Sequence, residues 1–275
     1  MSRKQRREHA EEHLAFIQNL PADQQILVDL SIKETKIFQI KVGIPPPVYE
    51  PRYEETDIHV VDGTTIQTVL DYKVDPEQLV TVLNFASATH PGGGWLRGSR
   101  AQDESLAMAS TLFLPLSKGA SKMYSLNEKY PKNGFYQDLI VYSPHVAVLK
   151  DDDNELLNTP VYMSVISVPA VNVGVVHEYT EKKRLDLYQI DSQIKKVMMS
   201  RCTAILKVAA KYNTDTLILG AFGCGVFRNN PNDVAWTFSQ LLNKQFLGVF
   251  KKVIFAIPND KNLGVFQQIF GETPI

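Results

Sequence analysis

Short strand-like segments alternate with helix-like segments along most of this chain. Segments rich in β-branched, aromatic and other apolar residues predict strands at 57–61, 79–85, 139–142, 160–168, 216–219 and 252–257. Apolar residues at helical spacing predict helices at 102–114, 186–212 and 232–246. Such alternation is typical of an α/β fold whose sheet is covered by helices on both sides.

The N-terminal segment departs from this alternation. Residues 1–20 are highly charged with a partial apolar stripe, which predicts a short helix, and a second apolar-periodic stretch covers residues 24–40. Four prolines between residues 43 and 51 exclude a helix there. We therefore expect an N-terminal helical extension over residues 1–52, packed on a main domain over residues 53–275.

The composition excludes several classes of protein. The 275 residues include 29 basic and 30 acidic side chains, so the chain has no overall basic surface for DNA. Cys202 and Cys224 are too few for a disulfide framework or a multi-cysteine zinc site. No apolar run approaches the roughly 18 residues that cross a bilayer, and no signal-peptide pattern is present. We expect an intracellular protein, cytoplasmic or nuclear, that binds neither DNA nor membranes.

Two glycine-rich loops each follow a predicted strand and precede a predicted helix. The first contains Gly92, Gly93 and Gly94, and the second spans residues 220–227. Loops after the carboxyl ends of strands line the ligand crevice of an open α/β sheet. Successive small residues in such a loop expose backbone N–H groups, which bind anions. The second loop lacks the spacing of a P-loop or of a Rossmann fingerprint, so the two loops together predict only a phosphate-bearing ligand.

Gln102, Asp103 and Glu104 begin the helix that follows the triple glycine. Adjacent carboxylates at a helix start commonly cap the helix and complement its dipole. Here they follow the glycines by only a few residues, which carries them to the ligand crevice. A role in chemistry therefore competes with the capping role.

The string PGGGWLRGSRAQDE resembles the signature of the poly(ADP-ribose) glycohydrolases, a triple glycine and a short spacer before Gln-Glu-Glu. Further blocks resemble the microbial-type branch of that family in order and spacing: LNFASATHPGGG, SLAMASTLF, LIVYSPHVAVLKDDDNELL, VISVPAVN and LGAFGCGVFRNNPNDVA. The resemblance covers roughly residues 55–260. It implies a macrodomain-like three-layer α/β/α fold, in which a mixed sheet lies between helices and ADP-ribose lies in a crevice at the crest.

The resemblance also implies roles for the acidic motif. Glu104 stands at the position of the catalytic glutamate, Asp103 at that of the preceding glutamate, which holds ribose hydroxyls, and Gln102 matches the motif glutamine. The middle residue is one methylene shorter than in the family pattern. Many macrodomains also carry Asn where this chain has Ser87, so either Ser87, Thr89 or His90 contacts the distal ribose or the contact is absent.

The remaining roles implied by the resemblance belong to the two loops. The first loop would wrap the diphosphate and the distal ribose through Gly92, Gly93 and Gly94. The second would present backbone N–H groups to the diphosphate from Gly223, Cys224, Gly225 and Val226. Phe227 would pack beside the distal ribose and fix its orientation.

The activity implied by the resemblance is hydrolysis of the ribose–ribose O-glycosidic bond of poly(ADP-ribose), with release of ADP-ribose from the chain end. Glu104 would act first as general acid and then as base, and the scheme needs no metal and no cofactor. The near-neutral charge fits recognition of one terminal unit, because gripping a long polyanion takes a basic groove. Two alternatives stay open: a mono-ADP-ribosyl hydrolase acting on ADP-ribosylated protein, and a non-catalytic module that binds ADP-ribose.

Overall fold

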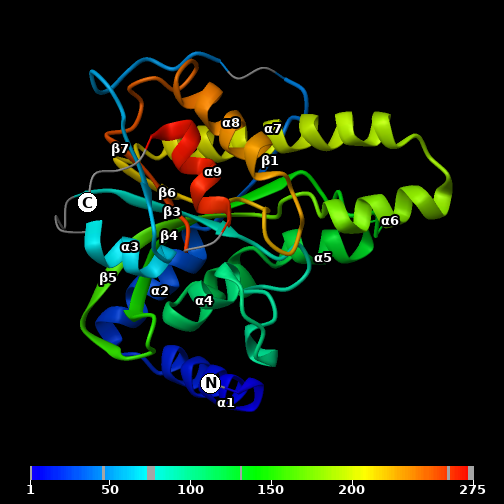
Figure 1. The fold of residues 1–275 in the computed structure, drawn as a ribbon. Helices are drawn as coiled ribbons and strands as arrows, with labels where there is room; N and C mark the ends of the chain where they lie inside the picture. Colours follow the sequence, from blue (N-terminus) through cyan, green and yellow to red (C-terminus); the bar gives the residue numbers. More distant parts are fainter. Residues whose placement is uncertain (1, 45–46, 73–77, 131, 259–260, 272–275) are drawn as a thin grey trace.

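The computed structural model describes residues 2–44, 47–72, 78–130, 132–258 and 261–271 and contains a mixed α/β fold (Figure 1). The strands are β1 Lys36–Gln39, β2 Asp57–Val61, β3 Val80–Phe85, β4 Leu139–Lys150, β5 Leu156–Val168, β6 Thr216–Leu219 and β7 Lys252–Ala256. The α-helices are α1 Arg3–Gln18, α2 Ala22–Glu34, α3 Thr65–Tyr72, α4 Gln102–Ala109, α5 Ser121–Lys129, α6 Val173–Lys183, α7 Leu187–Lys211, α8 Pro231–Leu242 and α9 Lys261–Phe270. A short 3₁₀ turn, η1 (Trp95–Arg97), precedes α4, and a π-helical turn, η2 (Pro115–Gly119), follows it.

The strands form one seven-stranded sheet in the order β1-β4-β5-β3-β6-β7-β2. The neighbours from β5 through β3, β6 and β7 to β2 are parallel, whereas β4 runs antiparallel to both β1 and β5. The central strands β3 and β6 are almost entirely buried, as expected where helices cover both faces of a parallel sheet. Since parallel strands end at the same edge, the loops after β3 and β6 lie together.

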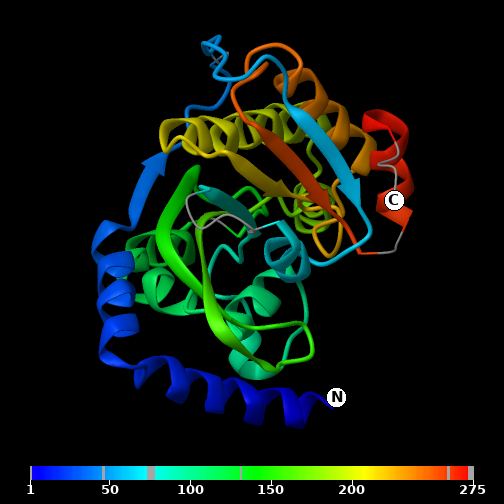
Figure 2. The same cartoon turned by 90° about the vertical axis from the view of Figure 1, so that its left-hand side faces the viewer.

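Helices cover both faces of the sheet, as Figures 1 and 2 show. On one face, α7, α8 and α9 contribute Ile205, Phe238 and Phe266 to the larger apolar core. On the other face, α3 and α4 contribute Ile66 and Leu106 to a second core. The predicted three-layer α/β/α arrangement with a mixed sheet is therefore confirmed.

The N-terminal elements α1, α2 and β1 wrap around the outside of the helical layer that contains α3 and α4 (Figure 2). Ile17 and Val28 pack with Leu114 and Leu149 in a small apolar cluster. The apolar stretch predicted at 24–40 is α2 followed by β1, and β1 pairs with β4 at the sheet edge. Pro45 and Pro46, two of the four prolines expected to exclude a helix, lie outside the described residues.

Several predicted elements have different bounds in the structure, and two of them differ most. The helix predicted at 102–114 ends at Ala109, because Ser110 adopts an extended backbone and bridges to Val148. The strand predicted to end at residue 142 continues to Lys150, although Pro144 interrupts its sequence pattern. The proline falls where the β4–β5 register shifts, a bulge that tolerates a residue without an N–H group.

Candidate active site

The triple-glycine loop is shaped by its contact with α4. Gly92 and Gly93 have φ angles of +64° and +65°, a region that favours glycine. A Cβ atom on Gly93 would lie 2.4 Å from Oε1 of Glu104, and one on Gly92 would lie 2.8 Å from Cβ of Ala107. The glycines therefore let the loop backbone lie directly against the first turns of α4.

Glu104 is held by this loop through one of its two oxygens. The N–H of Gly94 donates to Oε1 of Glu104 at 2.8 Å. Its Oε2 has no hydrogen-bond partner among the described residues, and the side chain is half-buried. The carboxylate is therefore oriented by the protein and keeps one oxygen for a ligand.

Asp103 lies one residue earlier in a different environment. It is 3% exposed, and its oxygens accept hydrogen bonds from Nδ2 of Asn84 at 3.0 Å and from the N–H of Ser87 at 2.8 Å. Burial raises the pKa of Asp103 to about 7; the two hydrogen bonds lower it and the charge of Glu104 raises it. Asp103 thus fastens the end of β3 and the loop after it to α4. The contact with ribose hydroxyls stays a prediction.

Asn84 was missed by the sequence reasoning, which looked for an amide at the position of Ser87. It is fully buried, and its Nδ2 also donates to Oγ of Ser167 at 3.1 Å. Its Oδ1 has no partner among the described residues. An asparagine near the end of the apolar strand VTVLNF was a usable signal, because a buried amide needs hydrogen-bond partners.

Ser87 organises the turn that follows β3. Its Oγ accepts from the N–H groups of Thr89, at 3.4 Å, and His90, at 3.2 Å. Those contacts stabilise the approach to the triple glycine. A ribose contact from Ser87 stays a prediction.

Gln102 also connects α4 to β3. Its Oε1 accepts from the N–H of Phe85 at 2.8 Å, and its Nε2 donates to the carbonyl of Leu83 at 2.7 Å and to Oγ1 of Thr65 at 3.2 Å. The amide is fully used in joining three elements. Gln102 therefore fixes the position of the first turn of α4, which carries Asp103 and Glu104.

The second glycine loop is fastened by an asparagine that the sequence reasoning also missed. Nδ2 of Asn229 donates to the carbonyls of Val171, at 2.8 Å, and Gly223, at 3.0 Å. Gly223 has φ +75°, and a Cβ there would lie 2.5 Å from Cβ of Ala170. A Cβ on Gly225 would meet nothing within 4 Å, so the backbone at Gly225 is open to a ligand.

A cleft of about 460 Å³, which we call the large cleft, lies along this loop. Its size is within the range of pockets for small ligands. Of the predicted residues, those lining it are Gln102, Gly223, Gly225, Val226 and Phe227. Cys224 is buried, and its thiol donates to the carbonyl of Phe222 at 3.6 Å. Glu104 lines an adjoining cavity that shares Arg100, Ser105 and Asp152 with the large cleft.

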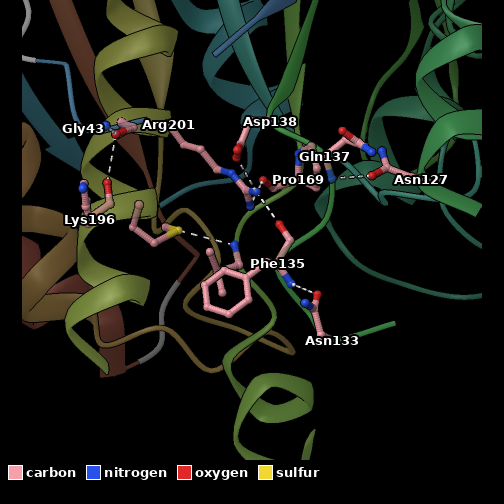
Figure 3. Close-up of polar contacts among 12 residues, drawn as sticks. Gly43, Asn127, Asn133, Phe135, Gln137, Asp138, Pro169, Lys196 and Arg201 are labelled. Atoms are coloured by element: carbon pink, nitrogen blue, oxygen red, sulfur yellow. Dashed lines mark hydrogen bonds and ion pairs between the residues drawn. The ribbon is translucent and has the colours of Figure 1, made fainter. Parts of the chain in front are cut away.

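Arg201 of helix α7 joins the segments around Phe135 and Pro169 (Figure 3). Arg201 is fully buried; it donates to the carbonyls of Pro169, at 2.9 Å, and Phe135, and it pairs with Asp138 at 3.3 Å. Burial lowers the pKa of this guanidinium, and the charge of Asp138 opposes the shift. One residue of α7 therefore holds two loops together.

The segments around Phe135 and Pro169, which Arg201 joins, are followed by residues that contact Phe227. The N–H of Val173 donates to the carbonyl of Phe227 at 2.9 Å, and the ring of Tyr136 lies 6.1 Å from the Phe227 ring. The N–H of Val171 donates to Sδ of Met198 at 3.4 Å, a second contact from α7. Phe227 is therefore positioned by backbone and ring contacts.

Among the described residues, no group of three His, Cys, Asp or Glu side chains is placed to hold a metal ion. No helix in the described ranges is long and apolar enough to cross a membrane.

Comparison with known proteins places the chain in a family. The family model described as "Microbial-type PARG, catalytic domain" matches residues 17–151. The structure of poly(ADP-ribose) glycohydrolase from Deinococcus radiodurans in complex with ADP-ribose has 30% identity and a TM-score of 0.76, covering 91% of this chain and 97% of that one. The chain belongs to the microbial-type poly(ADP-ribose) glycohydrolase family. The resemblance seen in the sequence motifs is thereby confirmed.

Other members of the glycohydrolase family agree with this assignment. The enzyme from Thermomonospora curvata has 29% identity and a TM-score of 0.82, covering 97% of this chain and all of that one. The same enzyme bound to the inhibitor ADP-HPD has a TM-score of 0.80 at 29% identity and the same coverage. No protein with a curated description matches the sequence. The likeness to solved glycohydrolases thus extends over both glycine loops and the N-terminal helices.

Proposed function

We propose that this protein hydrolyses the ribose–ribose O-glycosidic bond of poly(ADP-ribose) and releases ADP-ribose. The observation that carries the proposal is the carboxylate of Glu104, whose Oε1 is fixed by the triple-glycine loop and whose Oε2 has no partner in the described part of the chain. Glycosidic cleavage needs such an oriented acid beside the leaving oxygen. Relatives of known structure, described as bound to ADP-ribose, support the choice of substrate.

The proposed reaction uses Glu104 twice. The bond between C1″ of the terminal unit and O2′ of the next unit breaks, and the proton of Glu104 passes to O2′. Glu104 then takes a proton from the water whose oxygen bonds to C1″, which restores the acid. Asp103 is unsuited to this proton transfer because both of its oxygens already accept protein hydrogen bonds.

The large cleft is proposed to hold the terminal ADP-ribose unit. The open backbone at Gly225 and the neighbouring N–H groups suit a diphosphate, and Phe227 offers an aromatic wall. The 29 basic and 30 acidic residues leave no overall excess of positive charge to grip a polymer along its length. We therefore propose exo action from the chain end. A product mixture dominated by oligomers at early times would contradict it.

The test is turnover of purified polymer with release of ADP-ribose as the readout. Glu104→Gln keeps the size of the side chain and removes the proton donor, so we expect a loss of about 10²- to 10⁴-fold in kcat. Binding of ADP-ribose, measured by calorimetry, should change by only a few-fold. Hydrolysis by the variant at the parent rate would exclude Glu104 as the acid.

A mono-ADP-ribosyl hydrolase is the second candidate, favoured by the shortened and fully engaged side chain of Asp103. Supplying polymer and singly ADP-ribosylated protein side by side separates the two functions. Release of ADP-ribose from the singly modified protein alone would favour this candidate. Binding of ADP-ribose without release from either substrate would indicate a binding module.

A further inference from the structure

A second cavity, of about 290 Å³, adjoins the large cleft at the first turn of α4, and we call it the small cavity. It is lined by the proposed general acid, by the turn between β4 and β5, and by helix α1 of the N-terminal segment. Its lining includes Arg6, Arg100, Glu104, Ser105 and residues 151–153. The proposed function places the terminal ADP-ribose unit in the large cleft and assigns no part of the substrate to the small cavity.

The proposed reaction requires a site on this side of Glu104. A general acid must come within hydrogen-bond distance of the oxygen that leaves. That oxygen belongs to the adenosine ribose of the next unit, so the leaving nucleoside has to lie beside Glu104 and outside the large cleft. The small cavity is the space that Glu104 lines, and Arg100 and Ser105 form the boundary between the two sites.

The lining of the small cavity is mixed in charge. Arg6 and Arg100 supply guanidinium groups, while Asp151, Asp152 and Asp153 supply carboxylates. Oδ1 of Asp151 accepts from the backbone N–H groups of Asp153, at 3.0 Å, and Glu155, at 2.9 Å, so part of that charge is already used within the turn. Carboxylates accept from hydroxyl and amine groups, and guanidinium groups bind phosphates. A nucleotide carries both kinds of partner.

We propose that the small cavity is a leaving-group subsite for the adenosine of the penultimate polymer unit, with Arg6 facing its phosphates. The proposal rests on the proposed hydrolysis of poly(ADP-ribose). The volume of about 290 Å³ lies at the lower end of ligand pockets, which suits a nucleoside better than a whole ADP-ribose unit. The subsite gives the N-terminal helix a part in substrate recognition.

Arg6 is held close to the end of the triple-glycine loop. Its Nε donates to the carbonyl of Gly98 at 2.9 Å, just after η1. Arg3 makes a matching contact, because its Nε donates to the carbonyl of Arg97 at 3.1 Å, but Arg3 does not line the small cavity. The two arginines therefore differ in their access to the cavity and share their anchoring to the same turn.

The experiment compares Arg6→Gln with the matched control Arg3→Gln on two substrates. One is purified polymer, and the other is ADP-ribose carrying a nitrophenyl group on C1″, which has no nucleoside to place in the small cavity. For Arg6→Gln we expect kcat/KM on the polymer to fall about tenfold, the effect of one charge-assisted hydrogen bond. Its kcat/KM on the nitrophenyl substrate and its affinity for ADP-ribose should stay within about twofold of the parent. Arg3→Gln should leave kcat/KM unchanged on both substrates.

Other outcomes overturn the proposal in distinguishable ways. Unchanged polymer turnover by Arg6→Gln, or an equal loss on both substrates, would overturn the subsite and leave the proposed function standing. Parent protein that cleaves the nitrophenyl substrate and singly ADP-ribosylated protein but not polymer would assign the cavity to a protein acceptor. Parent protein that cleaves none of these substrates would overturn the proposed function itself.

Discussion

Asp103 and Glu104 are adjacent in the chain, yet the fold gives them separate tasks. Asp103 is buried against Asn84 and Ser87, whereas Glu104 lines the small cavity on the other side of the α4 turn. Successive residues of a helix point about 100° apart, so one side chain can face the sheet while the next faces the ligand. The shorter aspartate is therefore consistent with a positioning role for this residue.

The pKa of Asp103 predicts how stability depends on pH. Its pKa rises from 3.8 to about 7 on folding, so the folded chain holds this proton more tightly than the unfolded chain does. The stabilisation is fully present below about pH 4 and is lost as the pH rises through about 7. For one group the change is on the order of 4 kcal/mol at most.

Asp103→Asn should remove this dependence. The free energy of unfolding, measured by denaturant titration at intervals between pH 4 and 8, should fall more steeply with pH for the parent than for the variant. Asp29→Asn, at an exposed position on α2, serves as the control and should follow the parent. Parallel curves for parent and Asp103→Asn would show that Asp103 does not titrate in this range.

At the scale of elements, α7 shows what sequence pattern can predict. Its 25 residues keep one apolar face, and the expected bounds of 186–212 are correct to within a residue. The short helices α3, α5, α6 and α9 were not predicted, because 8 to 11 residues carry too few turns for a clear period. The motif of a triple glycine followed by an acidic pair singled out Glu104 from the sequence alone. The roles of Asn84 and Asn229 depend on contacts between distant segments, which no local pattern encodes.

Arg201 on α7 leads to a prediction about that helix. Arg201→Met would leave Asp138 and the carbonyls of Pro169 and Phe135 without their cation, so we expect the free energy of unfolding to fall by about 3–5 kcal/mol. ADP-ribose should bind more weakly, because these loops position Phe227.

The control for that prediction lies on the same helix. Nζ of Lys195 lies 3.3 Å from a carboxylate oxygen of Asp233, and both side chains are largely exposed. Lys195→Met should therefore cost less than about 1 kcal/mol. Chemical denaturation and calorimetry with ADP-ribose measure both variants. Equal losses of unfolding free energy in the two variants would show that the buried contacts of Arg201 contribute no more to stability than an exposed ion pair.

For the whole molecule, the N-terminal segment contributes to the sheet as well as to its surroundings. β1 lies within the predicted extension of residues 1–52 and covers the edge of β4. Val28 of α2 packs with Ala147 and Leu149 of β4. Removal of this segment would expose both an apolar patch and a long unpaired strand edge, a combination that promotes aggregation.

A graded pair of truncations tests how far the main domain is independent. We expect a chain that starts at residue 53 to lose cooperative thermal unfolding and to elute as aggregates in size-exclusion chromatography. A chain that starts at residue 20 keeps α2 and β1 and should unfold cooperatively at a lower Tm, because it loses the buried Ala10, His13 and Ile17 of α1. It should also bind ADP-ribose, since no residue of α1 lines the large cleft. Cooperative unfolding of residues 53–275 near the parent Tm would instead establish that segment as an autonomous domain.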